Sequence, residues 1–89
     1  MIINSIPGCC GVMEVMEFGG LSKANIISFL ISQRWPGMYI ATTVGRQKRA
    51  VAALQECGFR VLSTAKNPNT KAMITLWGRV GRPVWVKRS

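Results

Sequence analysis

The architecture of this 89-residue chain follows from the stretch Met-Tyr-Ile-Ala-Thr-Thr-Val-Gly-Arg-Gln-Lys-Arg-Ala at residues 38–50. Residues 38–44 are β-branched, aromatic and uncharged, as expected of a central strand that is covered on both faces. After Gly45, apolar side chains recur at helical spacing, at Ala50, Val51, Leu54 and Cys57. Gly58 supplies the left-handed residue that commonly ends a helix. We therefore expect a strand, a glycine turn and a helix from Arg46.

The flanking segments predict further elements. Ser22 is a good N-cap for a buried helix over residues 24–31, which the sequence Trp35-Pro36-Gly37 stops. Residues 59–65 and 71–80 predict two strands, joined as an antiparallel hairpin by the turn at 67–70. Residues 12–18 fit a strand or a helical turn, and residues 84–86 fit a last edge strand. The first 20 residues are otherwise unassigned.

These elements predict one small α+β domain over residues 1–89, with a mixed or antiparallel sheet, two helices and a C-terminal hairpin. A chain of 89 residues is too short for two domains, and 48% hydrophobic residues suffice for a core.

Charge is distributed unevenly along the chain. Residues 1–45 hold two bases and two acids, whereas residues 46–89 hold ten bases and one acid, which accounts for the net charge of +9. Such a basic half attracts nucleic acid, a phosphorylated cofactor or an acidic protein surface. With no His and no Asp, the chain lacks the residues for imidazole catalysis, and we expect no metal site.

The setting predicted from the sequence is cytoplasmic. The three cysteines, Cys9, Cys10 and Cys57, form a poor disulfide framework, which is typical of a reducing compartment. Residues 1–18 make an unconvincing signal peptide, and no stretch has the roughly 20 apolar residues that span a bilayer.

The segment Val44-Gly45-Arg46-Gln47-Lys48-Arg49-Ala50 is the candidate cofactor-binding site. Cations at the start of a helix oppose its dipole by roughly 0.3 to 1 kcal/mol each. Free amides, the dipole and added cations together make an anion site, so we expect phosphate there. Solvated surface cations that supply solubility are the alternative.

This part of the chain resembles the C-terminal half of a GNAT-type N-acetyltransferase. The resemblance is based on the strand 38–44, the helix after it, the sequence Glu56-Cys57-Gly58-Phe59, and a hairpin that contains Asn67-Pro68-Asn69 and Ile74-Thr75-Leu76-Trp77. The resemblance covers residues 38–80 and is greatest to small acetyltransferase-like proteins of lytic bacteriophages. It implies acetyl-CoA as a cofactor, with its pyrophosphate on a strand-to-helix turn marked Gln/Arg-x-x-Gly-x-Gly/Ala.

Two mappings onto that family are open. In the first, residues 47–52 are the turn that binds the pyrophosphate. Ala50 then stands where the family has a glycine, and glycine lets the backbone approach a phosphate closely because it has no side chain. In the second, the helix before Gly58 is the family's later helix, and Leu54 occupies the position of the tyrosine acid.

Acetyl transfer would also need a group that accepts a proton. Glu14 and Glu17 are the upstream candidates, although surface carboxylates are usually just solvated. Tyr39, the sole tyrosine, is a candidate acid, but its place in an apolar strand favours the core.

The resemblance implies an acetyl-CoA-dependent N-acetyltransferase, or a degenerate relative that keeps the scaffold. Because half of a GNAT sheet leaves an open edge and part of the core uncovered, we expect a homodimer through the C-terminal strand or the first helix. A phage protein of this kind would act in host takeover on a host cytosolic protein, such as RNA polymerase or another transcription component. The alternative is a noncatalytic basic module that docks on an acidic host protein or on nucleic acid, where Trp35, Trp77 and Trp85 could stack on bases and Arg79, Arg82, Lys87 and Arg88 could meet phosphates.

Overall fold

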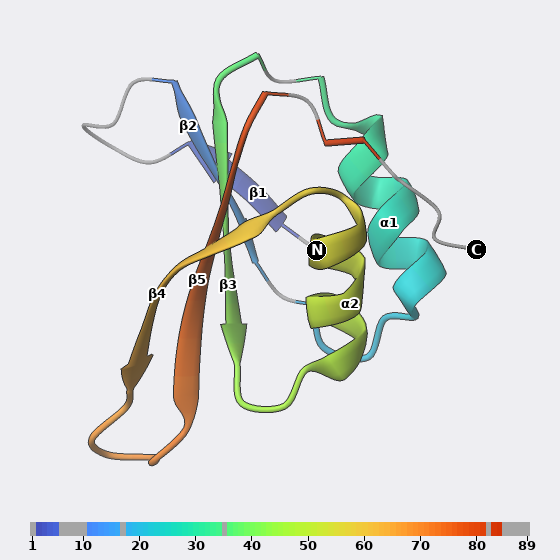
Figure 1. Ribbon diagram of the computed structural model, residues 1–89. Coiled ribbons are helices and arrows are strands. Elements are labelled where there is room, and N and C mark those ends of the chain that lie inside the picture. Colours follow the sequence, from blue (N-terminus) through green and yellow to red (C-terminus); the bar gives the residue numbers. More distant parts are fainter. Residues whose placement is uncertain (1, 6–10, 17, 35, 82, 85–89) are drawn as a thin grey trace.

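The computed structural model describes residues 2–5, 11–16, 18–34, 36–81 and 83–84. It forms two layers, a five-stranded sheet and a pair of helices. The strands are β1 (Ile2–Ser5), β2 (Val12–Met16), β3 (Met38–Val44), β4 (Arg60–Lys66) and β5 (Met73–Val80). The helices are α1 (Lys23–Ser32) and α2 (Lys48–Glu56), and Figure 1 shows both on the same side of the sheet. The predicted α+β fold class is confirmed.

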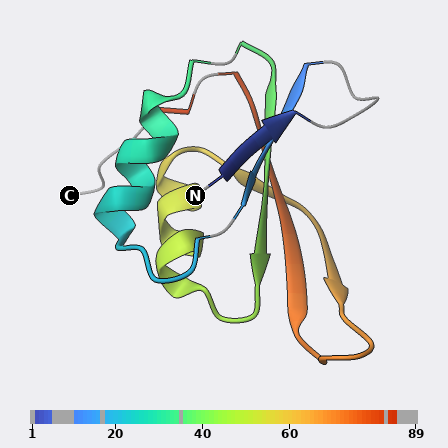
Figure 2. The same cartoon turned by 180° about the vertical axis from the view of Figure 1, so that it is seen from behind.

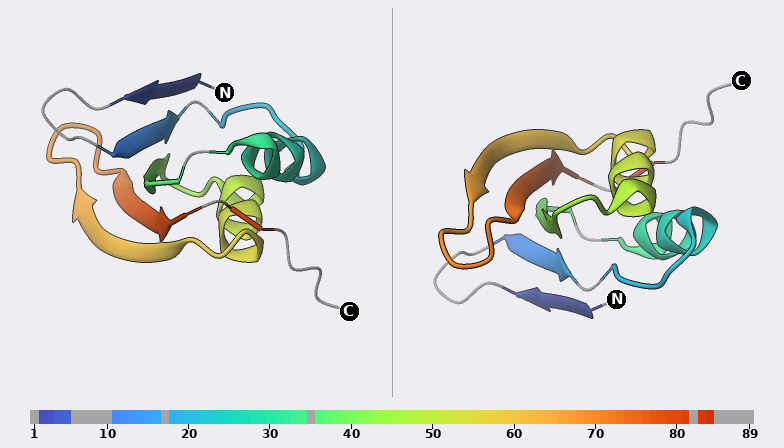
Figure 3. Two further views of the ribbon diagram at one scale, coloured as in Figure 1. Left: turned by 90° about the horizontal axis from the view of Figure 1, so that it is seen from above. Right: turned by 90° about the horizontal axis from the view of Figure 1, so that it is seen from below.

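The strand order in the sheet is β1-β2-β3-β5-β4. β2 and β3 are parallel neighbours connected through α1, while β5 lies antiparallel between β3 and β4. Right-handed crossovers that step across a sheet in one direction place their helices on the same face. Viewed from above, the helices accordingly form one layer and the strands the other (Figure 3).

The central strand β3 has the predicted bounds, but the expectation that both of its faces are covered was wrong. Its side chains alternate, with Tyr39, Ala41 and Thr43 buried towards the helices and Met38, Ile40 and Thr42 only half-buried on the other face. A run made only of apolar and hydroxyl side chains cannot show this alternation in sequence.

The core lies between the helices and the sheet. Its buried hydrophobic residues are Val15, Phe18, Ile26, Ile27, Leu30, Tyr39, Ala41, Ala50, Ala53, Leu54, Cys57, Phe59 and Trp77. An ion pair between Lys23 and Glu56 also joins α1 to α2. The two helices are therefore held to the sheet and to each other.

The predicted ends of the elements are largely confirmed. Ser22 is the N-cap of α1, and its Oγ accepts a hydrogen bond from the Asn25 amide at 3.2 Å. Gly58 follows α2 with φ +87°. The helix α2, however, begins at Lys48 and not at Arg46, because Gln47 is its N-cap.

The predicted hairpin is confirmed as well, with β4 and β5 antiparallel. Its turn extends beyond the end of β3, as seen from both sides in Figures 1 and 2. In the N-terminal segment, residues 12–16 are a strand rather than a helical turn. The predicted edge strand at 84–86 lies, apart from Val84, outside the described residues.

Candidate functional site

A shallow pocket of about 240 Å³ lies where two strand-to-helix connections meet. One wall is the β2-to-α1 connection, with Phe18, Gly19, Gly20 and Leu21, and the other is the start of α2. Because β2 and β3 are parallel neighbours, both connections leave the same end of the sheet. Ligands of open α/β sheets bind at this end, outside the carboxyl ends of parallel strands.

The turn at the end of β3 is held by its own hydrogen bonds. Gly45 has φ +65°, and its amide donates to the carbonyl of Met73 on the hairpin at 2.8 Å. The Oε1 atom of Gln47 accepts from the Val44 amide at 3.0 Å. The Gln47 side chain therefore closes the turn and makes no cap hydrogen bond to α2. The Lys48 amide donates to the Arg46 carbonyl at 2.8 Å, and the next amides, of Arg49 and Ala50, receive no side-chain cap.

The opposite wall is a tight turn. The Leu21 amide donates to the Phe18 carbonyl at 3.4 Å, and Gly20 has φ +76°, as the third residue of a type II turn requires. Gly19 and Gly20 place no side chain on this wall, and a Cβ added at either would meet nothing within 4 Å. A ligand can therefore approach the backbone closely here.

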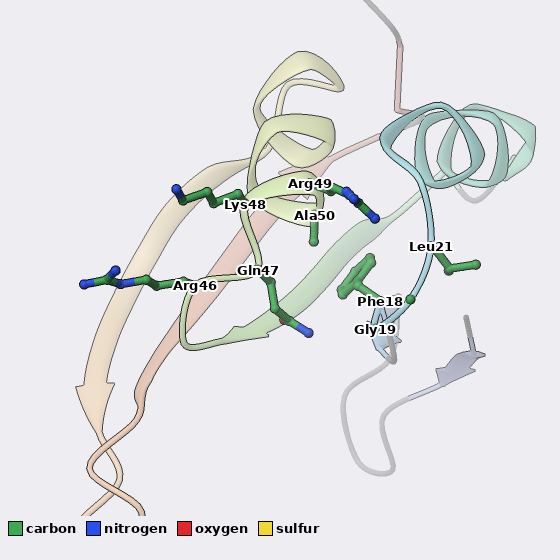
Figure 4. A pocket seen from close by; sticks show the side chains of 9 residues that line it. Phe18, Gly19, Leu21, Arg46, Gln47, Lys48, Arg49 and Ala50 are labelled. Carbon is green, nitrogen blue, oxygen red and sulfur yellow. The ribbon is translucent and has the colours of Figure 1, made fainter.

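Figure 4 shows how the side chains of the predicted segment divide around the pocket. Gln47, Arg49 and the methyl group of Ala50 point towards Phe18 and the α1 side. Arg46 and Lys48 point away, towards the side on which β4 runs. Ala50 is buried, whereas the three cations are exposed. All three cations line the pocket, and Arg49 is the one whose side chain is directed towards its opposite wall.

The predicted catalytic residues do not join this pocket. Glu14 is half-buried on β2 and is paired with Ile40, which places both on the face of the sheet without helices. Tyr39 is 1% exposed in the core, at the start of β3, whereas the pocket lies beyond the end of that strand. Val44 comes five residues after Tyr39, which is roughly 17 Å along the strand at 3.3 Å per residue. Glu17 lies outside the described residues.

Two other candidates for chemistry are buried. Trp77 is 4% exposed, so its ring offers no face for a nucleobase. Burial raises the pKa of the Cys57 thiol from 9.0 to about 11, with a further rise from the Glu56 carboxylate and an opposing effect of Arg79. Cys57 is therefore a protonated core residue at neutral pH. Cys9, Cys10, Trp35 and the basic residues Arg82, Lys87 and Arg88 lie outside the described residues.

Sequence reasoning missed the Gly19-Gly20 wall of the pocket. The signal was present, because a strand, a glycine turn and the N-cap Ser22 repeat the arrangement found around Gly45. Only the turn between β3 and α2 was predicted as a site, because that turn contains the cations.

Comparisons with known proteins found no matching family model, no similar curated protein and no similar solved structure. Within the residues that the structure describes, no helix has the length and apolar character needed to cross a membrane.

Proposed function

We propose that the pocket binds the phosphates of acetyl-CoA, and that the chain is a shortened GNAT-like N-acetyltransferase or a relative that binds the cofactor without transferring the acetyl group. The observation that carries this proposal is the meeting of two strand-to-helix turns at the ends of β2 and β3, with Arg49 facing the gap. Phosphate is favoured by a helix N-terminus with open amides and an added cation.

The order of the elements supports the same proposal. The structure contains strand 38–44, then the helix that ends before Gly58, then the hairpin. This is the order on which the resemblance to GNAT proteins is based. An earlier unit, β2 followed by α1, precedes them and contributes its own glycine turn. This favours the second mapping, in which α2 is the family's later helix.

That mapping bears on catalysis. Leu54 then occupies the position of the family's tyrosine acid, and its fully buried hydrocarbon side chain has no acidic proton to donate. Neither Glu14 nor Tyr39 borders the pocket. We therefore expect cofactor binding to be easier to detect than acetyl transfer. The resemblance to phage proteins extends the proposal to a host protein, such as a component of the transcription machinery, as acetyl acceptor or binding partner in the host cytoplasm.

Isothermal titration with acetyl-CoA, desulfo-CoA and ATP tests the proposal. We expect saturable micromolar binding of both CoA compounds, which share the phosphates, and weaker binding of ATP. Arg49→Glu should weaken binding at least tenfold, because it places a carboxylate opposite the phosphates.

The matched control is Arg60→Glu, which makes the same change of charge at the exposed start of β4, outside the residues that line the pocket. We expect its affinity for acetyl-CoA to stay within about threefold of the parent value, because only a weak long-range electrostatic effect of the changed charge remains. No binding at low salt, or equal losses in the two variants, would contradict the proposal.

A further inference from the structure

Four cations gather at one end of the molecule, and two of them, Arg46 and Lys48, also line the pocket at Phe18. We call Arg46, Lys48, Lys66 and Lys71 the basic rim. The hydrogen bond from the Gly45 amide to the Met73 carbonyl, at 2.8 Å, joins the β3-to-α2 turn to the base of the hairpin. Arg46 follows Gly45 directly, and Lys66 is the register partner of Met73. The cations are therefore neighbours in space although they span 26 positions of sequence, from 46 to 71 inclusive.

The register shows which face of the sheet Lys66 occupies. Trp77 and Thr43 point to the helix face, where the indole Nε1 donates to the Thr43 Oγ1 at 2.9 Å. Thr75 pairs with both Thr43 and Thr64, and Lys66 lies two residues beyond Thr64. Since side chains alternate along a strand, Lys66 lies on the helix face as well. That is the face from which the start of α2 rises, with Arg46 and Lys48 directed towards β4 (Figure 4).

The hairpin turn holds Lys71 in a fixed backbone geometry. The Asn67 Oδ1 atom accepts from the amides of Asn69, at 2.9 Å, and Thr70, at 3.3 Å. The Lys71 amide donates to the Asn67 carbonyl at 2.8 Å, and Lys71 has φ 62°. The turn is thus ordered by its own bonds before any partner arrives.

No acid neutralises the basic rim in the part of the chain that the structure describes. Glu56 stands at the far end of α2 from Lys48 and forms an ion pair with Lys23, while Glu14 lies on β2. All four cations of the rim are exposed. Arg46 and Lys48 also border a hollow of about 270 Å³ along the outer side of α2, next to the pocket at Phe18.

We propose that the basic rim binds the phosphate backbone of a nucleic-acid duplex. Phosphate contacts require cations and hydrogen-bond donors, and the exposed side chains of Asn69 and Thr70 add donors to the rim. Protein hot spots are enriched in Trp, Tyr and Arg, whereas the large apolar side chain exposed beside Lys66 is that of Met73, its register partner. The described aromatic residues Phe18, Tyr39, Phe59 and Trp77 are all buried, and Phe29 belongs to α1. The same absence of exposed rings near the rim disfavours single strands, whose bases stack on aromatic side chains.

Fluorescence anisotropy with a labelled 20-base-pair DNA duplex tests this inference. If four phosphates are contacted, the slope of log affinity against log salt is about −3.6, so affinity should fall roughly 100-fold between 50 and 200 mM salt. The double variant Lys66→Glu/Lys71→Glu should bind at least tenfold more weakly at 50 mM and with a slope reduced by about 2.

The charge-matched control is Arg34→Glu/Arg60→Glu. Both residues are exposed and lie away from the rim, after α1 and at the start of β4. It should keep affinity within about threefold, a loss typical of long-range electrostatics alone. Equal weakening in the two double variants would overturn the proposal, because net charge alone would then explain binding. Circular dichroism of each variant confirms folding, and Lys66→Gln/Lys71→Gln repeats the test with smaller changes of charge.

Further ligands separate the remaining outcomes. A duplex of RNA should bind through the same chemistry, and a single strand of DNA should bind more weakly than either duplex. Tighter binding of polyglutamate than of duplex, with the same sensitivity to Lys66 and Lys71, would overturn the proposal in favour of an acidic protein partner. The rim variant should titrate with acetyl-CoA like the parent protein, so the failure of this proposal is distinguishable from the failure of the cofactor site.

Discussion

The indole of Trp77 on β5 donates a hydrogen bond to the hydroxyl of Thr43 on β3, at 2.9 Å. Both residues are nearly inaccessible to solvent, with 4% and 2% of their surfaces exposed. Thr43 stands three residues before Arg46, where the α2 wall of the candidate cofactor pocket begins. The bond therefore fixes the end of β3 against the hairpin at the point where the site starts.

We expect Thr43→Val to destabilise the fold by about 1 to 3 kcal/mol, because it leaves the buried indole N–H without an acceptor. Trp77→Phe removes the donor and ring volume and should cost about 2 to 4 kcal/mol. The double variant should cost less than the sum of the two, since neither partner is then left alone. Urea unfolding of the four proteins measures the coupling, and additive losses would show that the bond contributes nothing.

Gln47→Glu should raise stability and lower cofactor affinity at the same time. A carboxylate at this position can still accept from the Val44 amide, and it interacts favourably with the dipole of α2, by about 0.3 to 1 kcal/mol. The same negative charge faces the pocket and repels phosphate. Thermal unfolding and titration with acetyl-CoA should therefore move in opposite directions.

The control for this change is Gln55→Glu, an exposed substitution in the last turn of the same helix. There the added charge opposes the dipole, so stability should fall by a few tenths of a kcal/mol. If Gln47→Glu lowers stability as well, the open amides at the start of α2 do not attract negative charge and the argument for a phosphate site loses its basis.

The second half of the fold was predictable because local signals there agree. Three features specify backbone geometry independently of the rest of the chain: the β-branched run at 38–44, the glycines at 45 and 58, and the Asn-Pro-Asn turn. The order of the strands was not predictable, since the insertion of β5 between β3 and β4 depends on long-range pairing. The same holds for β1, whose four residues carry no distinctive pattern.

The candidate site was half predictable. Cations at the start of a helix identified the segment 44–50, but sequence does not show the direction in which a side chain points. Arg46 and Arg49 look equivalent in sequence, and only the geometry of the turn sends them to opposite sides. The Phe18-to-Leu21 wall is brought to the pocket by the parallel pairing of β2 with β3, which is a tertiary fact.

The homodimer expected from the sequence stays a prediction. The β4 strand forms one edge of the sheet with all seven residues exposed, and the half-buried Met38 and Ile40 lie on the face that no described helix covers. Covering such surfaces with a second copy would remove apolar area from water. Light scattering should give twice the chain mass of 9.8 kDa at micromolar concentration. A mass of 9.8 kDa across the concentration range would contradict it.

The stability of the protein should fall between pH 9 and pH 11 because of Cys57. Burial raises the pKa of this thiol from 9.0 in the unfolded chain to about 11 in the folded one. A group whose pKa is raised on folding stabilises the protein fully below its unfolded pKa. This contribution is lost as the pH rises through the folded pKa, since the unfolded chain then releases the proton more readily. The shift corresponds to a loss on the order of 2 kcal/mol.

The variant Cys57→Ala isolates this effect. Its absolute stability should be lower by about 1 kcal/mol because a buried sulfur is removed, but its stability should decline less steeply between pH 9 and pH 11. Other groups that titrate in that range are common to both proteins, so the difference between their unfolding curves reports Cys57 alone. Parallel curves for the two proteins would mean that the thiol ionises equally easily in the folded and unfolded chains, and that the end of α2 is open to water.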